Sequence, residues 1–248
     1  MNTLIADLLK KYDGTFMTVG IAGSVAVGKS TFASLLAKQF DVTTAIISTD
    51  DFLMSNALLT EKDIFNEKGF PQTYDLVRLN QVIRDFYDGH ETVTIPQYNQ
   101  EIADIDPKQL QTITRPKILI VEGVVALQLM HLDYKIYLEA DLNDIKAWYL
   151  SRTLEMTALA KADPTSWRYQ YTKMPLGDLT DLVMQTWDET NQVNLEKFIL
   201  PSRQYANAIV QLNQYHDVQQ VTIKIYNRLS TLLTIYFVKR IILNMVVK

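Results

Sequence analysis

The fold is decided by residues 19–31, which read VGIAGSVAVGKST. This run contains the pattern G-x-x-x-x-G-K-[ST], in which Gly23 and Gly28 flank a loop that Lys29 and Ser30 close. In such a loop, backbone N–H groups converge on a phosphate, the lysine reaches the β- and γ-phosphates, and the hydroxyl sits on Mg²⁺. The predicted nucleotide site is therefore Gly23, Ser24, Val25, Ala26, Val27, Gly28, Lys29, Ser30 and Thr31.

The flanks of this loop agree with the pattern. Residues 15–21 are apolar and β-branched, which predicts a strand, and residues 31–40 have helical spacing. A helix that begins at the loop adds its partial positive charge where the phosphates bind. The alternative, a glycine-rich turn beside a solvated lysine, does not require a strand and a helix on either side.

Composition limits the classes of protein to consider. The chain has 248 residues, of which 48% are hydrophobic and 21% are charged, values that suit one α/β domain, with or without a lid. A net charge of −4 argues against a nucleic-acid-binding surface. The absence of cysteine from the sequence excludes a disulfide framework, a thiolate nucleophile and Cys-ligated zinc. The first lysines follow apolar residues, so we expect no secretory signal, as for a cytoplasmic protein.

Short apolar runs without strict alternation predict strands that are covered on both faces, as in a parallel sheet. These runs are residues 15–21, 43–48, 117–121 and 134–139. Helical spacing predicts helices over 74–87, 142–161 and 177–193, and two further strand-like runs follow at 208–212 and 218–225. Asp141 is the expected N-cap of the second helix. We expect one α/β domain over residues 1–225.

The last residues, 226–248, are expected to form an apolar C-terminal extension of unknown role. Lys239 and Arg240 interrupt its apolar run, and adjacent charges there disfavour a membrane span. A helix at a membrane surface and an unpacked extension both stay open.

Carboxylates follow two of the predicted strands. Asp50 and Asp51 come after residues 43–48, and Glu122 comes after 117–121. Open α/β sheets place their sites at the carboxyl ends of the strands. Either aspartate could accept the proton of a substrate hydroxyl as that hydroxyl attacks a γ-phosphoryl group, whereas the alternative role is a helix N-cap. Glu122 is placed to orient Mg²⁺.

One arginine is a candidate for stabilising the transferred phosphoryl group. Arg152 stands three residues after Tyr149 in a predicted helix, so the two share a face. An arginine that faces the site could stabilise the negative charge spread over that group. A solvated surface arginine is the competing interpretation.

Beyond the loop, the chain resembles the type I pantothenate kinases of bacteria. The resemblance rests on GIAGSVAVGKS, STDDF, KGFPQTYD, ILIVEG, AWYLSR and NLEKFILPSR, which follow in order between residues 18 and 225. It implies a P-loop kinase fold with a central, mostly parallel sheet, helices on both faces and a helical substrate flap. It also implies ATP-dependent phosphorylation of pantothenate to 4′-phosphopantothenate, the first step toward coenzyme A, with ATP and Mg²⁺ as cofactors, and a homodimer.

By position in these motifs, the resemblance also assigns roles. Lys29 and Ser30 match the phosphate lysine and the magnesium ligand, and Glu122 matches the acid beside the magnesium. Asp50 matches the catalytic base and Arg152 the transition-state arginine. The residues that match contacts to pantothenate are Tyr98, Tyr149 and Asn194, and Tyr171 matches an aromatic residue of the flap.

The chain departs from the family pattern in its pocket. Gln100 stands where the family has a histidine that contacts substrate and coenzyme A, and Ser34 stands where it has a basic residue for coenzyme A phosphate. Thr153 and Met156 replace phenylalanines, and Trp167-Arg168 replaces Tyr-Phe. The phosphoryl-transfer residues are thus retained while the pocket wall changes.

Two alternatives stay open from the sequence. A uridine-kinase-like or other small-molecule P-loop kinase would also carry a sequence like STDDF. A nucleotide- or coenzyme-A-binding regulator without catalysis would not need the retained Asp50 and Arg152.

Overall fold

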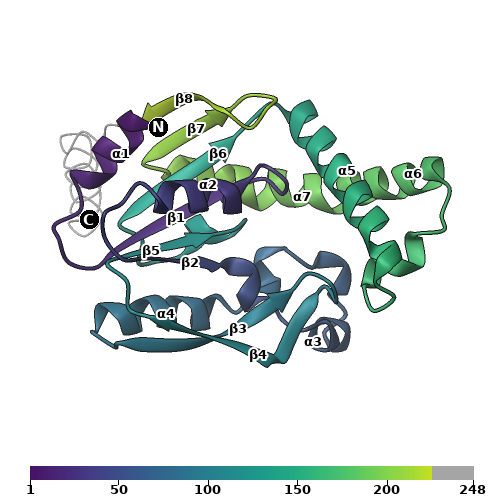
Figure 1. The fold of residues 1–248 in the computed structure, drawn as a ribbon, viewed down its shortest axis with the longest axis horizontal. Coiled ribbons are helices and arrows are strands. Elements are labelled where there is room, and N and C mark those ends of the chain that lie inside the picture. Colours follow the sequence, from purple (N-terminus) through teal and green to yellow (C-terminus); the bar gives the residue numbers. More distant parts are fainter. Residues whose placement is uncertain (225–248) are drawn as a thin grey trace, which may run out of the picture.

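The computed structural model describes residues 1–224, and its centre is a six-stranded sheet in the order β2-β5-β1-β6-β7-β8. The strands are β1 (Met17–Gly23), β2 (Thr44–Ser48), β5 (Ile118–Glu122), β6 (Tyr134–Glu139), β7 (Ala208–Leu212) and β8 (Val218–Ile223). Every neighbouring pair is parallel except β7 and β8, which are antiparallel. The mostly parallel α/β sheet predicted from the sequence is confirmed (Figure 1).

Burial along the strands explains why their sequences are continuously apolar. Every residue of β1 and of β5 is buried, as expected for central strands that are covered on both faces. The edge strands β2 and β8 are more exposed. The predicted strands fall on β1, β2, β5, β6, β7 and β8, although residue 225 of the last one lies outside the described residues.

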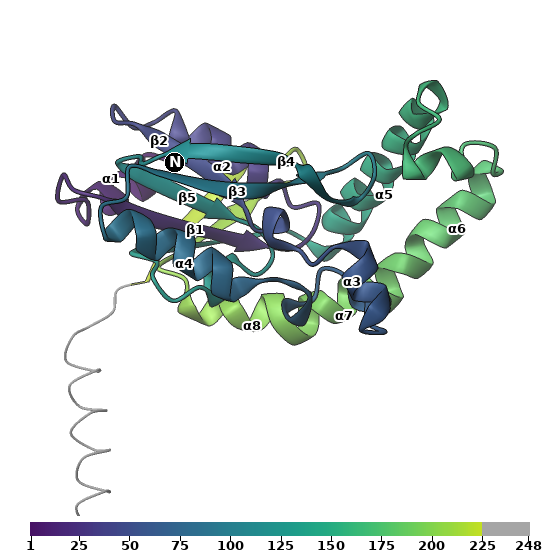
Figure 2. The same cartoon turned by 90° about the horizontal axis from the view of Figure 1, so that it is seen from below.

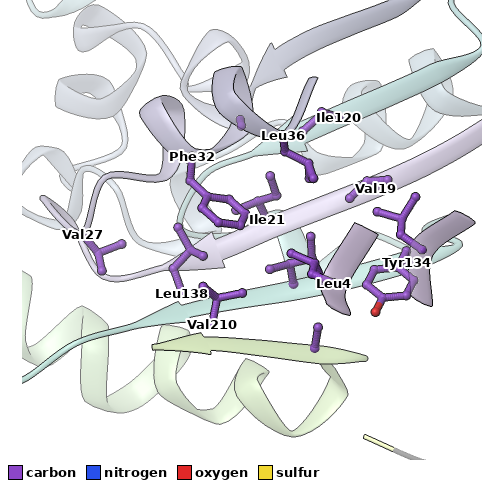
Figure 3. Packing of buried hydrophobic residues seen from close by; sticks show 14 of the residues in the cluster. Leu4, Val19, Ile21, Val27, Phe32, Leu36, Ile120, Tyr134, Leu138 and Val210 are labelled. Atoms are coloured by element: carbon purple, nitrogen blue, oxygen red, sulfur yellow. The ribbon is translucent and has the colours of Figure 1, made fainter. Parts of the chain in front are cut away.

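Helices cover both faces of the sheet. On one face, α1 (Asn2–Leu9) and α2 (Lys29–Ala37) place Leu4, Phe32 and Leu36 against Val19 and Ile21 of β1 (Figure 3). Each fully buried leucine of this kind stabilises the fold by about 1.5–3 kcal/mol. On the other face, α4 (Leu76–Tyr87) packs through a second cluster that includes residues of β2 and β5.

A separate antiparallel hairpin, β3 (Thr92–Asn99) and β4 (Asp104–Thr114), was not predicted. Its apolar residues Val93, Ile95 and Ile113 pack in the same cluster as α4. The pairing shifts register beside Pro96, a residue that cannot donate to a ladder and is therefore tolerated at such an irregularity. The short helix α3 (Asn56–Glu61) lies between β2 and α4 in the chain.

The helical flap implied by the resemblance spans residues 142–186 and extends from one end of the sheet (Figures 1 and 2). It consists of α5 (Leu142–Leu159), a 3₁₀ turn (Trp167–Tyr171) and α6 (Leu176–Thr186). Asp141 caps α5 as predicted, because its carboxylate accepts a hydrogen bond from the N–H of Asn143 at 2.8 Å.

The helix predicted over 177–193 is longer than expected. After α6 the chain passes through a π turn (Trp187–Asn191), α7 (Gln192–Asn194), a second π turn (Leu195–Ile199) and α8 (Leu200–Ser202). A period of 3.6 residues does not describe these wider turns, which explains why the predicted end came too early.

A small polar network joins α4, β1 and β6 at the amino end of the sheet. The carboxylate of Asp133 accepts hydrogen bonds from the N–H of Thr18, at 2.8 Å, and from the hydroxyl of Tyr87. Burial and this carboxylate raise the pKa of Tyr87 to about 12. The network therefore depends on a protonated Tyr87.

The expected apolar extension, 226–248, lies outside the described residues. Within residues 1–224, every helix is too short or too polar to cross a membrane.

Candidate active site

The loop after β1 has the geometry that phosphate binding needs. Gly28 adopts φ +89°, and a Cβ at this position would come within 3.1 Å of the His216 ring. Gly23 adopts φ +155°, and a Cβ there would lie 2.5 Å from the carbonyl oxygen of Leu138. Only glycine satisfies both conditions at these places. The loop therefore closes tightly, and α2 begins at Lys29 with its free N–H groups facing the loop.

Lys29, Ser30 and Glu122 meet at the ends of three strands. Glu122 lies opposite Ile21 of β1 and Ser48 of β2 in the ladder, which brings its carboxylate beside the loop. The Ser30 hydroxyl donates a hydrogen bond to Oε1 of Glu122 at 2.8 Å, and Lys29 Nζ donates one to the carbonyl of Ser24 at 2.9 Å. The Ser30 hydroxyl, the Glu122 carboxylate and the Lys29 ammonium group therefore all lie beside the same loop.

The charges of this group influence one another. Burial lowers the pKa of the Lys29 ammonium, and the carboxylates of Glu122 and Asp50 oppose that effect. Burial raises the pKa of Glu122, and Lys29 together with the Ser30 hydrogen bond opposes it. These interactions place Asp50 within electrostatic reach of the phosphate lysine.

The structure separates the two aspartates that the sequence left as alternatives. Oδ1 of Asp51 accepts the backbone N–H of Tyr98 at 2.9 Å, so this carboxylate holds the hairpin against the strand end. Asp50 instead lines an open cavity, and its Oδ1 accepts the Tyr74 hydroxyl at 3.1 Å. Neither aspartate is the N-cap of the short 3₁₀ helix Thr49–Phe52. That cap is Ser48, whose hydroxyl accepts a hydrogen bond from the N–H of Asp50. Of the two aspartates, Asp50 is the one that lines the cavity.

This cavity, here called the acceptor cavity, has a volume of about 1010 Å³. It lies between the strand ends, the β3–β4 hairpin, the flap and the helix that follows the flap. Four of the residues predicted to contact substrate line it together with Asp50: Tyr98, Tyr149, Tyr171 and Asn194. Burial and Asp50 raise the pKa of Tyr98 to about 12, so its hydroxyl stays protonated even in alkaline solution near pH 10.

Asn194 is held between the two π turns and carries an unused acceptor. Its Nδ2 donates to the carbonyl of Gly69 at 2.7 Å. Its Oδ1 is buried and has no hydrogen-bond partner among the described residues. A buried amide oxygen without a donor is costly, and a ligand N–H or O–H in the acceptor cavity would satisfy it.

Arg152 lies on the exposed side of α5 and is not part of the cavity lining. Its charge nevertheless acts on both Lys29 and Tyr149. The guanidinium therefore lies within electrostatic reach of the phosphate lysine.

The sequence analysis missed Lys68, which also lines the acceptor cavity. Its Nζ donates to Oδ1 of Asn56, at 2.7 Å, and to the carbonyl of Ala103, and it lies 5.2 Å from the centre of the Tyr98 ring. Burial lowers its pKa, while Asp104 and Asp50 raise it. Lys68 is the first residue of the KGFPQTYD motif, which was the available signal, but that motif was used only for the family resemblance.

A second missed feature flanks the phosphate loop. The rings of Trp148 and His216 stack with centroids 3.7 Å apart, and Trp148 Nε1 donates to the carbonyl of Gln214 at 3.2 Å. The His216 ring also lies beside the loop, because a Cβ at Gly28 would come within 3.1 Å of it. A single histidine in a polar turn carries no pattern, so its place beside the loop could not be predicted.

Comparisons with known proteins agree with this geometry. A model of the phosphoribulokinase / uridine kinase family matches residues 18–156. The pantothenate kinase of Streptococcus pneumoniae strain P1031 is 36% identical over 220 residues, which cover 83% of this chain and 72% of that relative. The chain belongs to the pantothenate kinase family. The family resemblance expected from the motifs is confirmed.

Solved structures of more distant kinases share the fold of this family member. A putative fructose transport system kinase from Silicibacter sp. TM1040 superposes with a TM-score of 0.63 at 18% identity, covering 78% of this chain and 91% of that one. A D-glycerate 3-kinase from Cryptococcus neoformans gives 0.60 at 13% identity, with 90% and 98% covered. At such low identity these likenesses concern the fold alone, and they confirm the P-loop kinase architecture.

Proposed function

We propose that the protein transfers the γ-phosphoryl group of ATP to the hydroxyl of pantothenate, giving 4′-phosphopantothenate. The observation that carries this proposal is one cavity in which Asp50, beside the phosphate loop, faces Tyr98, Tyr149, Tyr171 and Asn194. Its chemistry suits a small polar alcohol with amide groups, because it combines a carboxylate base with tyrosine hydroxyls and a free amide oxygen. Membership of a kinase family supports ATP as the donor.

Asp50 serves as the general base in this proposal. Tyr74 donates to one carboxylate oxygen, and no residue within 1–224 donates to the other, which accepts the proton of the attacking hydroxyl in this proposal. When ATP binds, Lys29 releases its hydrogen bond to the Ser24 carbonyl and binds the β- and γ-phosphates instead. Arg152 stabilises the negative charge that spreads over the phosphoryl group in the transition state.

The residues beside the loop fit a magnesium ion. Mg²⁺ is bound by hard oxygen ligands, commonly one or two from the protein with the remainder from phosphates and water. The Ser30 hydroxyl and the Glu122 carboxylate are neighbouring oxygen donors that hydrogen-bond to each other at 2.8 Å. Ser30 and Glu122 would hold the ion, which would neutralise charge on the phosphates when bound.

The stacked Trp148 and His216 rings offer an aromatic surface beside the loop for the nucleotide base.

Residues 1–225 act as one kinase unit. The resemblance supports a homodimer, whose mass light scattering after gel filtration measures. A cytoplasmic location fits the need for ATP.

The test is an acceptor screen with purified protein, ATP and Mg²⁺. Pantothenate, D-glycerate, uridine and cytidine are compared by ADP release, and the products are identified by mass. We expect turnover with pantothenate and a product heavier by one phosphoryl group. Turnover with a nucleoside instead would favour a uridine kinase, and ATP binding without turnover of any acceptor would favour a regulator.

A further inference from the structure

Asp50 and Asp51 are consecutive residues of one short element, but their carboxylates have different partners. Both belong to the 3₁₀ helix Thr49–Phe52, against which strand β3 of the hairpin packs. Asp50 lines the acceptor cavity, whereas Asp51 is only 9% exposed and is not part of the lining. The proposed function uses Asp50 as the base and gives the buried carboxylate no part in the reaction.

The Asp51 carboxylate binds the backbone of a residue in the cavity wall. Its Oδ1 accepts a hydrogen bond from the N–H of Tyr98 at 2.9 Å. Burial raises the pKa of the Asp51 carboxyl, and the hydrogen bond from Tyr98 opposes this effect. A hydrogen bond to an ionised group is stronger than one between neutral groups. Asp51 therefore fixes the backbone from which the Tyr98 side chain extends.

The Tyr98 side chain lines the cavity and is held on other sides as well. The ammonium of Lys68 lies 5.2 Å from the centre of its ring. The ring also packs against a small apolar cluster, which consists of Leu53, Tyr74 and Val125. Within residues 1–224 the Tyr98 hydroxyl has no hydrogen-bond partner, so it is available to an acceptor.

A short connection joins this phenol to the base. One peptide unit links Asp50 to Asp51, and one hydrogen bond links Asp51 to Tyr98. Asp50 and Tyr98 line the same cavity, so an acceptor bound there can meet both of them. The position of the Tyr98 backbone relative to the base therefore depends on Asp51.

We infer that Asp51 is a positioning residue that sets the affinity for the acceptor by holding Tyr98 against the segment that carries the base. This inference rests on the proposed function, in which Tyr98 contacts pantothenate. It goes further in giving a buried carboxylate outside the cavity lining a measurable effect on acceptor binding. It also states that this effect passes through the Tyr98 hydroxyl.

Other contacts keep the hairpin in place when Asp51 is changed. Near the tip of the hairpin, Oδ1 of Asp104 accepts a hydrogen bond from the N–H of Asn56 at 2.8 Å. The buried apolar residues of β3 and β4 pack in the same cluster as α4. Loss of the Asp51 carboxylate should therefore loosen Tyr98 locally while the hairpin stays folded.

The experiment is a double-mutant cycle on the KM for pantothenate, with the wild type, Asp51→Ala, Tyr98→Phe and the double variant. Asp51→Asn is added because its amide oxygen can still accept the Tyr98 N–H. The control is Asp106→Ala, since Asp106 accepts the N–H of Lys108 at 2.9 Å on β4, outside the cavity lining. The kcat, the KM for ATP and the melting temperature are recorded for each protein.

Asp51→Ala should raise the KM for pantothenate about 10-fold, the effect of one hydrogen bond to a charged group. The kcat and the KM for ATP should change little, because lost binding that is equal in the ground and transition states raises KM alone. In the Tyr98→Phe background, the same substitution should raise this KM less than about 2-fold, since the hydroxyl that Asp51 positions is gone. Asp51→Asn should fall between Asp51→Ala and the wild type, and Asp106→Ala should match the wild type.

Three results would overturn the inference. An effect of Asp51→Ala that is equally large in the Tyr98→Phe background would show that the carboxylate does not act through Tyr98. Asp51→Asn that binds pantothenate as poorly as Asp51→Ala would contradict a role for the Oδ1 acceptor. An unchanged KM for pantothenate in Tyr98→Phe would do so without any Asp51 variant, even if Asp51→Ala fails to fold.

These outcomes leave pantothenate phosphorylation standing, because each is measured on a protein that turns pantothenate over. Absence of turnover by the wild type would instead overturn the proposed function, and this inference with it.

Discussion

The hydroxyl of Tyr74 donates a hydrogen bond to Oδ1 of Asp50 across 3.1 Å, from a side chain that is only 6% exposed. Burial and the Asp50 carboxylate raise the pKa of Tyr74 well above its usual value, so the phenol stays protonated and keeps donating at neutral pH. The contact fixes the carboxylate and leaves its second oxygen for the substrate.

The first prediction tests this contact with Tyr74→Phe. The ring retains its packing against Leu53 and Val125, so we expect the fold to survive with a small loss of stability. The freed carboxylate should lower kcat about 10- to 100-fold, as expected when a reacting group loses its orientation. Steady-state kinetics with near-normal kcat would show that Asp50 is held in place by other contacts.

Arg152→Ala should lower kcat by about 10²-fold or more, with little change in the KM for ATP, if the guanidinium acts in the transition state. The matched control is Lys146→Ala on the same helix, which removes a solvent-facing ion pair with Asp188 and should change kcat little. An Arg152→Ala enzyme that is altered only in ATP affinity would assign the arginine to nucleotide binding.

Coenzyme A should inhibit this enzyme weakly. The resemblance implies that coenzyme A competes with ATP for its site. In this chain, however, Ser34 and Gln100 stand where the family has a basic residue and a histidine that contact coenzyme A. The Ser34 hydroxyl donates to the carbonyl of Ser30 within α2, and the carbonyl of Gln100 accepts from Arg168. Loss of even one hydrogen bond to a charged group weakens binding about 10- to 100-fold.

A titration of coenzyme A at fixed ATP measures this effect. Strong competitive inhibition at low micromolar coenzyme A would show that the replaced contacts were dispensable. Gln100→His supplies the complementary variant, which should become more sensitive than the wild type.

Stability should fall in alkaline solution through Tyr87. Its folded-state pKa of about 12 lies above the ordinary value of 10.0, because of burial and the Asp133 hydrogen bond. Folding therefore favours the protonated phenol, so this contribution is fully present below pH 10 and is lost as the pH rises toward 12. In urea unfolding, the stability advantage of the wild type over Tyr87→Phe should shrink across that interval. A constant advantage would contradict the assignment.

Much of the architecture was predictable because it follows from local patterns. The central strands are apolar at every position because both faces are covered, and the phosphate loop has a fixed spacing. The carboxyl-end rule placed Glu122 and Asp50 at the same edge of the sheet, where the ladder indeed brings the strand ends together. The roles of these residues stay predictions.

The rest depends on contacts between distant segments. The choice between Asp50 and Asp51 required the hairpin, whose Tyr98 N–H occupies Asp51, and that hairpin itself was missed. Its strand β3 does alternate at first, with Val93 and Ile95 buried and Thr92 and Thr94 exposed, but the buried Pro96 interrupts the pattern. Arg168 was noted as a departure from the family, yet only the fold shows that its Nε is buried and lacks a hydrogen-bond partner among residues 1–224.

The most direct test of the central claim is the kcat of Asp50→Asn with pantothenate, measured beside ATP binding by the same protein. Loss of a positioned general base predicts a decrease in kcat of about 10²- to 10⁴-fold, with ATP binding retained. Near-normal turnover of pantothenate by Asp50→Asn would contradict the account.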